Sequence, residues 1–324
     1  MMLLKGMRVE ITAPSRLHLG LLTDGNNQRP WQGIGIAIKE PRTILFAETI
    51  EASGLRIAGN FENELELVVR KFYSDLNVSV GVNLEFIEYP PRHVGLGSGT
   101  QIILSAATAI SILAEIRMSI EEIAARTNRG KYSWIGIEAF RNGGFIISLG
   151  QRKNSYLQPI MRLNFPEDWL IILSIPDKRR GLSGLLEDDI LSKIKYSEET
   201  VKNIHSCVMS KVLPGIIEHN IELFGKGVES VQRLVGSEFE SIQGGIFNPD
   251  SAELAELMLD AGLYGVGQSS WGPTIYGFTD KPDDARSFLR LVKDLMPNLE
   301  VYITTAENKG ARVIFSQSNS SVFS

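Results

Sequence analysis

The sequence predicts an α+β protein built in two halves, each combining strands with helices. Its 324 residues suffice for one large domain or two ordinary ones. Hydrophobic residues make up 43% and charged residues 22%, a composition typical of globular proteins that excludes disordered, collagen-like and coiled-coil chains. Segments of alternating hydrophobicity and segments of helical spacing follow one another along the chain. A polar, proline-containing stretch, Gln151–Pro166, indicates a boundary, so we assign the halves to residues 1–160 and 161–324.

The N-terminal half opens with strands. Arg8-Val9-Glu10-Ile11-Thr12 alternates polar and apolar residues, as a half-buried strand does. Helical spacing, a long apolar run and a capping box of Ser119 with Glu122 predict three helices. The predicted strands are Arg8–Ala13, Leu17–Leu22, Ile34–Lys39, Thr43–Thr49, Val80–Ile87 and Phe145–Leu149. The predicted helices are Glu62–Leu76, Ile102–Ala114 and a short one after Ser119, with an ordered loop over Arg126–Gly136.

The C-terminal half mixes short strands with longer helices. The predicted strands are Trp169–Ile175, Leu263–Val266, Thr274–Phe278, Leu299–Thr304 and Arg312–Phe315. The predicted helices are Leu185–Ser192, Glu198–Met209, Leu213–Val235, Ser251–Ala261 and Asp283–Met296. This order predicts a ferredoxin-like tail. The polar end, Gln317–Ser324, is expected to fray.

Charge and cysteine content narrow the function. The net charge of -5 and the pI of about 5.6 imply no basic face of the kind that binds nucleic acid or anionic membranes. Cys207 is the only cysteine and the four histidines show no paired spacing, so we expect neither a disulfide framework nor a zinc centre. No apolar run resembles a signal peptide or a membrane span. These features predict a soluble cytoplasmic protein that binds neither nucleic acid nor membrane.

A glycine-rich loop is the strongest chemical signal. Gly95-Leu96-Gly97-Ser98-Gly99-Thr100 lies between a predicted strand and a predicted helix. Glycines let phosphate oxygens approach the backbone, and the start of a helix supplies N–H groups and a positive dipole end. The loop is neither a Walker A loop nor a dinucleotide fingerprint, because it lacks their spacing. The alternative is a tight turn with a Ser or Thr cap, but three alternating glycines exceed what a cap needs.

Two other segments carry polar groups suited to binding. Arg16 and His18 lie two apart on a strand and therefore share one face. The alternative is a solvated sheet face. Gly265–Pro273 joins two short strands and holds the donors Gln268, Ser269, Ser270 and Trp271. The alternative there is a polar hairpin turn, although its glycines suit the close approach of a ligand or another loop.

These three segments, in this order, resemble the motifs of the GHMP kinase superfamily. The glycine loop resembles its P-x-x-x-G-L-G-S-S-A phosphate loop, with Gly99-Thr100 in place of Ser-Ala. The details resemble one branch, the β-ribofuranosylaminobenzene 5′-phosphate synthases, over about residues 8 to 315. The matching segments are Ala13–Gly20, Gly33–Ile38, Arg180–Gly184, Gln243–Gly245 and Gly265–Gly277. The resemblance implies a two-domain GHMP-kinase-like fold, with an N-terminal half like ribosomal protein S5 domain 2 and a ferredoxin-like C-terminal half.

The resemblance also implies an activity. Synthases of this branch are decarboxylating glycosyltransferases (pentosyltransferases) of tetrahydromethanopterin-type cofactor biosynthesis. They join phosphoribosyl pyrophosphate to 4-aminobenzoate and release CO2 and pyrophosphate. For this chain the acceptor is expected to be 4-aminobenzoate or a related aromatic acid. The implied partners are these small molecules with Mg²⁺ as cofactor, and a homodimer is compatible with the resemblance. ATP would be used only under the kinase alternative below.

The resemblance assigns roles residue by residue. Arg16 and His18 are the predicted catalytic residues, and the metal ligands stay unassigned. The predicted substrate-binding residues are Ser15, Arg29, Arg179, Arg180, Ser183, Gln268, Ser269, Ser270 and Trp271. The predicted phosphate-binding residues are Gly95, Leu96, Gly97, Ser98, Gly99 and Thr100. We expect the three segments to converge on one cleft, and we expect a Gly97→Val variant to lose phosphate binding with little change in melting temperature.

Two departures bear on the alternatives. GHMP kinases carry a catalytic Asp where this chain has Gly136, and glycine cannot abstract a proton. An ATP-dependent small-molecule kinase, mevalonate or homoserine kinase-like, would therefore need Glu138 as its base. A non-catalytic phosphate-ligand sensor is the second alternative, although Arg16 and His18 exceed what simple phosphate binding requires. Ser148 stands where the synthases usually show Asp, which predicts a divergent member.

Overall fold

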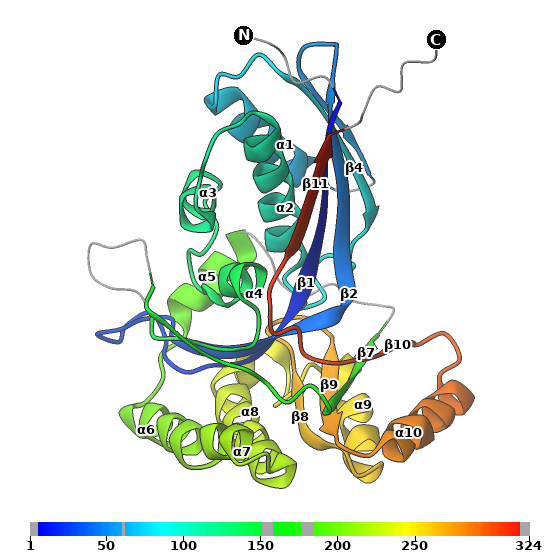
Figure 1. The fold of residues 1–324 in the computed structure, drawn as a ribbon. Coiled ribbons are helices and arrows are strands. Elements are labelled where there is room, and N and C mark those ends of the chain that lie inside the picture. The colour runs from blue at the N-terminus through cyan, green and yellow to red at the C-terminus, as the bar shows by residue number, and fades with distance from the viewer. Residues whose placement is uncertain (1–5, 60–61, 151–157, 177–184, 318–324) are drawn as a thin grey trace.

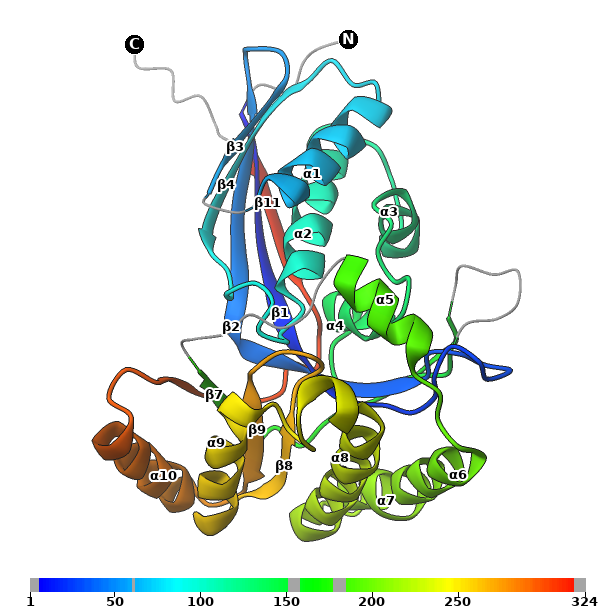
Figure 2. The same cartoon turned by 180° about the vertical axis from the view of Figure 1, so that it is seen from behind.

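The computed structural model describes residues 6–59, 62–150, 158–176 and 185–317, which form two β-sheets with helices packed on them (Figures 1 and 2). The first sheet has the order β11-β1-β2-β4-β3, and β5 pairs with both β2 and β6. Its strands are β1 (Met7–Leu21), β2 (Gly33–Ile50), β3 (Leu55–Ala58), β4 (Gly81–Glu88), β5 (Phe145–Ser148), β6 (Ile160–Leu163) and β11 (Arg312–Gln317).

Helices of the N-terminal half cover one face of this sheet, as the positions of α1 and α2 in Figure 2 show. These helices are α1 (Asn63–Asp75), α2 (Ser98–Leu113), α3 (Ile120–Arg126) and α4 (Ile135–Arg141). Phe72 and Ile103 pack with Val9 and Leu45 in one core, and burying each such side chain stabilises the fold by about 1.5–3 kcal/mol. The predicted capping box is confirmed, because the Ser119 hydroxyl accepts from the Glu122 N–H and the Glu122 carboxylate accepts from the Ser119 N–H.

The first two strands are longer than predicted. Each spans two segments that the sequence indicated as separate, because the prolines in their middles interrupt the ladder without ending it. The register of β1 against β2 shifts between Ala13 and Ser15, so Pro14 lies at an irregularity in one bent hairpin. The half of β1 beyond this point carries Arg16 and His18 toward the second sheet.

The second sheet confirms the ferredoxin-like prediction. Its order, β10-β7-β9-β8, places the fourth, first, third and second of its strands side by side, and all neighbours are antiparallel. Its strands are β7 (Leu170–Ile175), β8 (Tyr264–Gln268), β9 (Ile275–Thr279) and β10 (Glu300–Thr304). The helices of the C-terminal half are α5 (Leu185–Lys193), α6 (Glu198–Cys207), α7 (Leu213–Ile217), α8 (Ile221–Gln243), α9 (Pro249–Asp260) and α10 (Pro282–Leu295), with a π-helix at Val208–Val212.

Three local expectations are wrong. The expected loop over Arg126–Gly136 runs into helix α4, where six of the seven residues are buried, so the segment shows no amphipathic spacing. The predicted helix Leu213–Val235 is two helices, because His219 adopts φ +57° and Asn220 caps α8 by accepting from the Leu223 N–H. The strand β11 returns to the first sheet beside β1 (Figure 1). With β6 also in the first sheet, sheet membership does not follow the predicted division at residue 160.

One core joins the two sheets. Leu17 and Ile36 from the first sheet pack with Phe224 of α8 and Tyr276 of β9, all fully buried. This contact fixes β1 against α8 and the second sheet, which is where the candidate site lies. Among the described residues, no helix combines the length and the apolar character needed to cross a membrane.

Candidate active site

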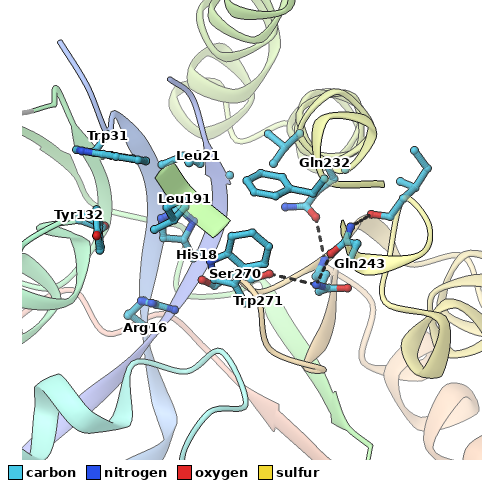
Figure 3. A pocket seen from close by; sticks show the side chains of 17 residues that line it. Arg16, His18, Leu21, Trp31, Tyr132, Leu191, Gln232, Gln243, Ser270 and Trp271 are labelled. Atoms are coloured by element: carbon cyan, nitrogen blue, oxygen red, sulfur yellow. Dashed lines mark hydrogen bonds between the residues drawn. The ribbon is translucent and has the colours of Figure 1, made fainter. Parts of the chain in front are cut away.

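A cavity lies between β1 of the first sheet and α8 with β8 of the second. Figure 3 shows its walls, which also include the loop before β2, helix α5 and the turn after β8. The lining side chains that carry polar or aromatic groups are Arg16, His18, Trp31, Tyr132, Ser133, Gln232, Phe239, Gln243, Gln268, Ser270 and Trp271. The described lining residues include no Asp or Glu, so an anionic ligand meets no opposing carboxylate in this wall.

Arg16 stands between this cavity and the glycine loop. Its guanidinium donates from Nη1 to the Gly95 carbonyl at 2.7 Å, and its backbone N–H donates to the Leu96 carbonyl at 3.1 Å. A guanidinium presents five N–H donors in a planar fork, so one such bond is compatible with holding a phosphate or a carboxylate. The geometry supports the anion-binding role that the sequence predicts for Arg16.

His18 is a buried neutral imidazole. Burial, together with the neighbouring Arg16 charge, lowers the pKa of His18 from 6.5 to about 3. At neutral pH it therefore carries no proton to donate as an imidazolium, and it is a weak base. The sequence left proton transfer and substrate positioning open for His18, and this environment favours positioning.

We expect acid to destabilise the wild-type protein more than a His18→Gln variant. Between pH 6.5 and pH 3 the unfolded chain protonates His18 while the folded chain does not, so stability falls as the pH falls through this window. From pH 7 to pH 5 this contribution is about 2 kcal/mol. Urea unfolding of both proteins at the two pH values measures it. Equal losses in the two proteins would contradict a neutral, buried His18.

The three predicted segments do converge. The Ser269 hydroxyl donates to the Gly95 carbonyl at 2.6 Å and accepts from the His18 backbone N–H at 3.0 Å. The Thr274 hydroxyl donates to the Val94 carbonyl at 2.5 Å. Gly272 presses against the Val94 backbone so closely that any side chain there would collide with it. Gly272 therefore serves the approach of another loop, one of the two roles that the sequence left open for the glycines of this segment.

The glycine loop ends at the start of α2. Gly97 is the N-cap residue with φ +71°, and no side chain caps the helix. Arg92 lies beside this helix start, because a Cβ added to Gly99 would stand 3.6 Å from Arg92 Nη2. Arg92 also pairs with Glu62 at 2.9 Å. The start of α2 thus lies between the arginines at 16 and 92, although the loop itself does not line the cavity and Leu96 is buried in the core.

Several predicted substrate-binding residues lie elsewhere. Ser15 is fully buried on the opposite face of β1, where its hydroxyl donates to the Pro41 carbonyl at 2.5 Å. Arg29 is exposed and does not line the cavity. Ser269 is fully buried and holds the three segments together instead of facing the cavity. Gln268, Ser270 and Trp271 do line the cavity, while Arg179, Arg180 and Ser183 fall outside the described residues.

Gln268 belongs to a network of glutamines that shapes the cavity wall. Its Nε2 donates to the Ser270 carbonyl at 3.1 Å and to Gln243 Oε1 at 3.4 Å. Its backbone N–H donates to Gln232 Oε1 at 2.9 Å, and Gln232 donates to the Leu19 carbonyl at 2.7 Å. These side-chain amides form hydrogen bonds within the protein, so their role is to hold the cavity wall in position.

Neither Gly136 nor Glu138 places a proton-accepting side chain in the cavity, as a kinase would need. A side chain at Gly136 would point toward Thr100 and Arg16, whereas the Glu138 carboxylate is buried and bound on both oxygens, by Asn142 at 2.7 Å and by Arg141 at 2.8 Å. Glu138 does not line the cavity. The predicted substitute base is therefore absent from this site.

Metal binding stays a prediction. Within the described ranges, no group of three His, Cys, Asp or Glu side chains could hold a metal ion. Ser148, at the position of the family Asp, is fully buried and hydrogen-bonded to Gln158. The described residues thus do not fit a Mg²⁺ site made by the protein alone, because Mg²⁺ prefers carboxylate and phosphate oxygens.

Sequence reasoning missed the aromatic side of the cavity. Trp31 and Tyr132 both line it, and Leu191 of α5 lies over it (Figure 3). A tryptophan just before a strand, and the aromatic segment around Tyr132, were the available signals. Their pairing depends on contacts a hundred residues apart, which no local pattern reports.

Comparisons with known proteins identify the relatives of this chain. Residues 212–298 match the family described as GHMP kinases C terminal. β-Ribofuranosylphenol 5′-phosphate synthase of Methanothermobacter thermautotrophicus is 30% identical, over 94% of this chain and 98% of that protein. The synthase of the same name from Methanocaldococcus jannaschii is 32% identical, over 94% and 99%. These names contain a phenol where the expected branch name contains an aminobenzene.

Solved structures share the fold at lower identity. A mevalonate kinase from Methanococcus jannaschii superposes with a TM-score of 0.69 at 14% identity, covering 92% of this chain and 98% of that one. A homoserine kinase from Cytophaga hutchinsonii gives 0.66 at 17% identity, covering 95% and 97%. The predicted GHMP-kinase-like fold is therefore confirmed. On the sequence identity and coverage of its synthase relatives, the chain belongs to the β-ribofuranosylphenol 5′-phosphate synthase family of the GHMP kinase superfamily.

Proposed function

We propose that this enzyme joins C1 of the ribose in phosphoribosyl pyrophosphate to the ring of an aromatic acid, releasing pyrophosphate and CO2. One observation carries the proposal. Arg16 lies between a cavity with aromatic walls and the uncapped start of α2, next to Arg92. An anionic leaving group and a planar acceptor can therefore be bound side by side. The family membership supports the same reaction.

The aromatic acid that we propose carries a hydroxyl group. The relatives are named for a ribofuranosylphenol product, which a 4-hydroxybenzoate-like acid would give and 4-aminobenzoate would not. The hydroxyl group of one acid and the amino group of the other both donate electrons into the ring, so both acids suit the reaction described below. We therefore favour 4-hydroxybenzoate as the substrate and use 4-aminobenzoate as the comparison.

The reaction balances without a protein base. The bond from C1 to the pyrophosphate oxygen breaks with its electron pair going to pyrophosphate, and the sugar gains oxocarbenium character. The ring carbon that bears the carboxylate attacks C1. The bond to the carboxylate then breaks, its electrons return to the ring, and CO2 leaves. No proton is transferred, which agrees with a cavity whose histidine is neutral and whose described lining holds no carboxylate.

The residues act on charge and position. Charge grows on pyrophosphate as its bond to C1 breaks, and arginines and helix N–H groups aimed at that charge lower the barrier. We assign this role to Arg16, Arg92 and the start of α2, which lie near one another. We propose Mg²⁺ only as an ion bound to the substrate phosphates, since these would supply most of its oxygen ligands.

The kinase alternative predicts a different result for Glu138. Because Asn142 and Arg141 hold its carboxylate away from the cavity, we expect a Glu138→Gln variant to keep synthase activity within about twofold. Its cost should instead appear in stability, about 1–3 kcal/mol, since a buried charged pair is broken. Rates of pyrophosphate release and urea unfolding of the two proteins measure both effects. Phosphorylation of a small alcohol by wild type with ATP, abolished in a Glu138→Gln protein that folds normally, would favour the kinase.

The direct test follows CO2 from carboxyl-labelled 4-hydroxybenzoate, and separately from labelled 4-aminobenzoate, with phosphoribosyl pyrophosphate. The proposal expects CO2 and pyrophosphate in equal amounts. A parallel assay measures ATP turnover with small alcohols. ATP turnover without CO2 release would establish the kinase, and tight binding of phosphoribosyl pyrophosphate without any turnover would establish the sensor.

A further inference from the structure

Two aromatic pairs line the cavity, and they differ in their relation to the core. Trp271 and Phe239 meet edge-to-face, with ring centroids 4.5 Å apart, and both pack in the hydrophobic core that joins the sheets. Trp31 and Tyr132 also meet edge-to-face, at 5.0 Å and 75°. This second pair is half-buried and belongs to none of the core clusters formed by the described residues. Both of its side chains line the cavity.

The backbone holds Trp31 in a costly conformation. Trp31 has φ +64°, a region that bulky side chains seldom occupy and that is found mostly where surrounding structure enforces it for function. The loop that carries it is firmly closed. The Thr23 hydroxyl donates to the Arg29 carbonyl at 2.9 Å and accepts from the Gln32 N–H at 3.0 Å. The buried Asp24 carboxylate accepts from the Tyr196 N–H at 2.6 Å, which ties the loop to the segment after α5.

We propose that Trp31 and Tyr132 form the wall against which the aromatic acid binds, and that they determine its selection. The inference rests on the proposed function and adds the acceptor subsite. Figure 3 shows both side chains on one side of the cavity, with Trp271 across from them and Arg16 at one end. A planar ring can pack edge-to-face or offset against such a pair. Its carboxylate would then lie toward Arg16, beside the phosphate groups that start the reaction.

The test compares Trp31→Leu and Tyr132→Leu with the wild-type enzyme. Leucine keeps the apolar character but loses the ring, and it requires no new backbone conformation. We expect the KM for the aromatic acid to rise at least about tenfold in Trp31→Leu, while the KM for phosphoribosyl pyrophosphate stays within about twofold. Trp31→Phe should recover much of the loss. Phe46→Leu, on an exposed face of the first sheet outside the cavity, is the matched control and should change neither KM.

A binding measurement separates this inference from the proposed function. Saturation-transfer NMR on wild-type enzyme detects 4-hydroxybenzoate and its saturated counterpart, 4-hydroxycyclohexanecarboxylate. We expect transfer to the aromatic acid in the wild type, weaker transfer to the saturated acid, and loss of the aromatic signal in Trp31→Leu. Unchanged aromatic binding in both leucine variants would overturn the wall even if the synthase reaction holds. If the wild-type enzyme binds the aromatic acid but shows no turnover, the proposed reaction is wrong and the proposed binding wall stands.

Discussion

We expect an Arg16→Ala variant to lose at least about tenfold in kcat/KM for phosphoribosyl pyrophosphate, equivalent to about 1.4 kcal/mol of transition-state stabilisation. Arg16 is the cation that the fold places between the cavity and the glycine loop, with one N–H already anchored on the Gly95 carbonyl at 2.7 Å. That anchor fixes the guanidinium before substrate arrives, so little ordering is needed as the pyrophosphate charge develops. The loss should appear in kcat as well as in KM, because the charge grows only as the bond to C1 breaks.

Arg29→Ala is the matched control for this loss. The sequence predicts both arginines as anion-binding residues, yet Arg29 is exposed and outside the cavity. We expect its kcat/KM to remain within about twofold of wild type. Arg16→Lys should recover only part of the activity, since an ammonium lacks the planar fork. Equal losses in Arg16→Ala and Arg29→Ala would contradict the position that we assign to the leaving group.

The fold could be predicted where local patterns decide it. The ferredoxin-like order of the second sheet followed from the succession of strands and helices, and the Ser119 capping box fixed the start of α3. The return of β11 to β1 could not be predicted, because pairing between residues 7–12 and 312–317 is a long-range contact that leaves no local signal. Helix α4 was missed for another reason, since a short helix with six of its seven residues buried shows no alternation of a polar and an apolar face.

The site divides in the same way. Arg16, His18, Gln268, Ser270 and Trp271 were found because strand alternation and a donor-rich turn mark them. Ser15 was misplaced although alternation alone puts it on the face opposite Arg16. Most of the other cavity residues come from α5, from α8 and from the loops that carry Trp31 and Tyr132, so only the folded chain brings them together.

The glycine loop gives the second large effect, and here the structure changes the expectation. Gly97 has φ +71°, and a Cβ there would approach Arg16 Cγ to 2.8 Å. Gly97→Val therefore strains the backbone, at a cost of about 1–3 kcal/mol, and pushes Arg16 from its place. We expect both a lower melting temperature and a loss of phosphoribosyl pyrophosphate binding, whereas the sequence alone predicted little thermal effect. Differential scanning fluorimetry and calorimetric titration measure the two quantities.

Gly99→Val separates phosphate binding from stability. Gly99 lies in the first turn of α2 without a left-handed φ, and a Cβ there would make only ordinary contact, 3.6 Å from the flexible end of Arg92. Valine and glycine differ little in helix propensity, so the melting temperature should hold. The new side chain would stand between Arg92 and the start of α2, where we place the pyrophosphate, and binding should weaken at least about tenfold. A Gly99→Val protein that binds phosphoribosyl pyrophosphate as wild type does would show that the phosphates bind away from this helix.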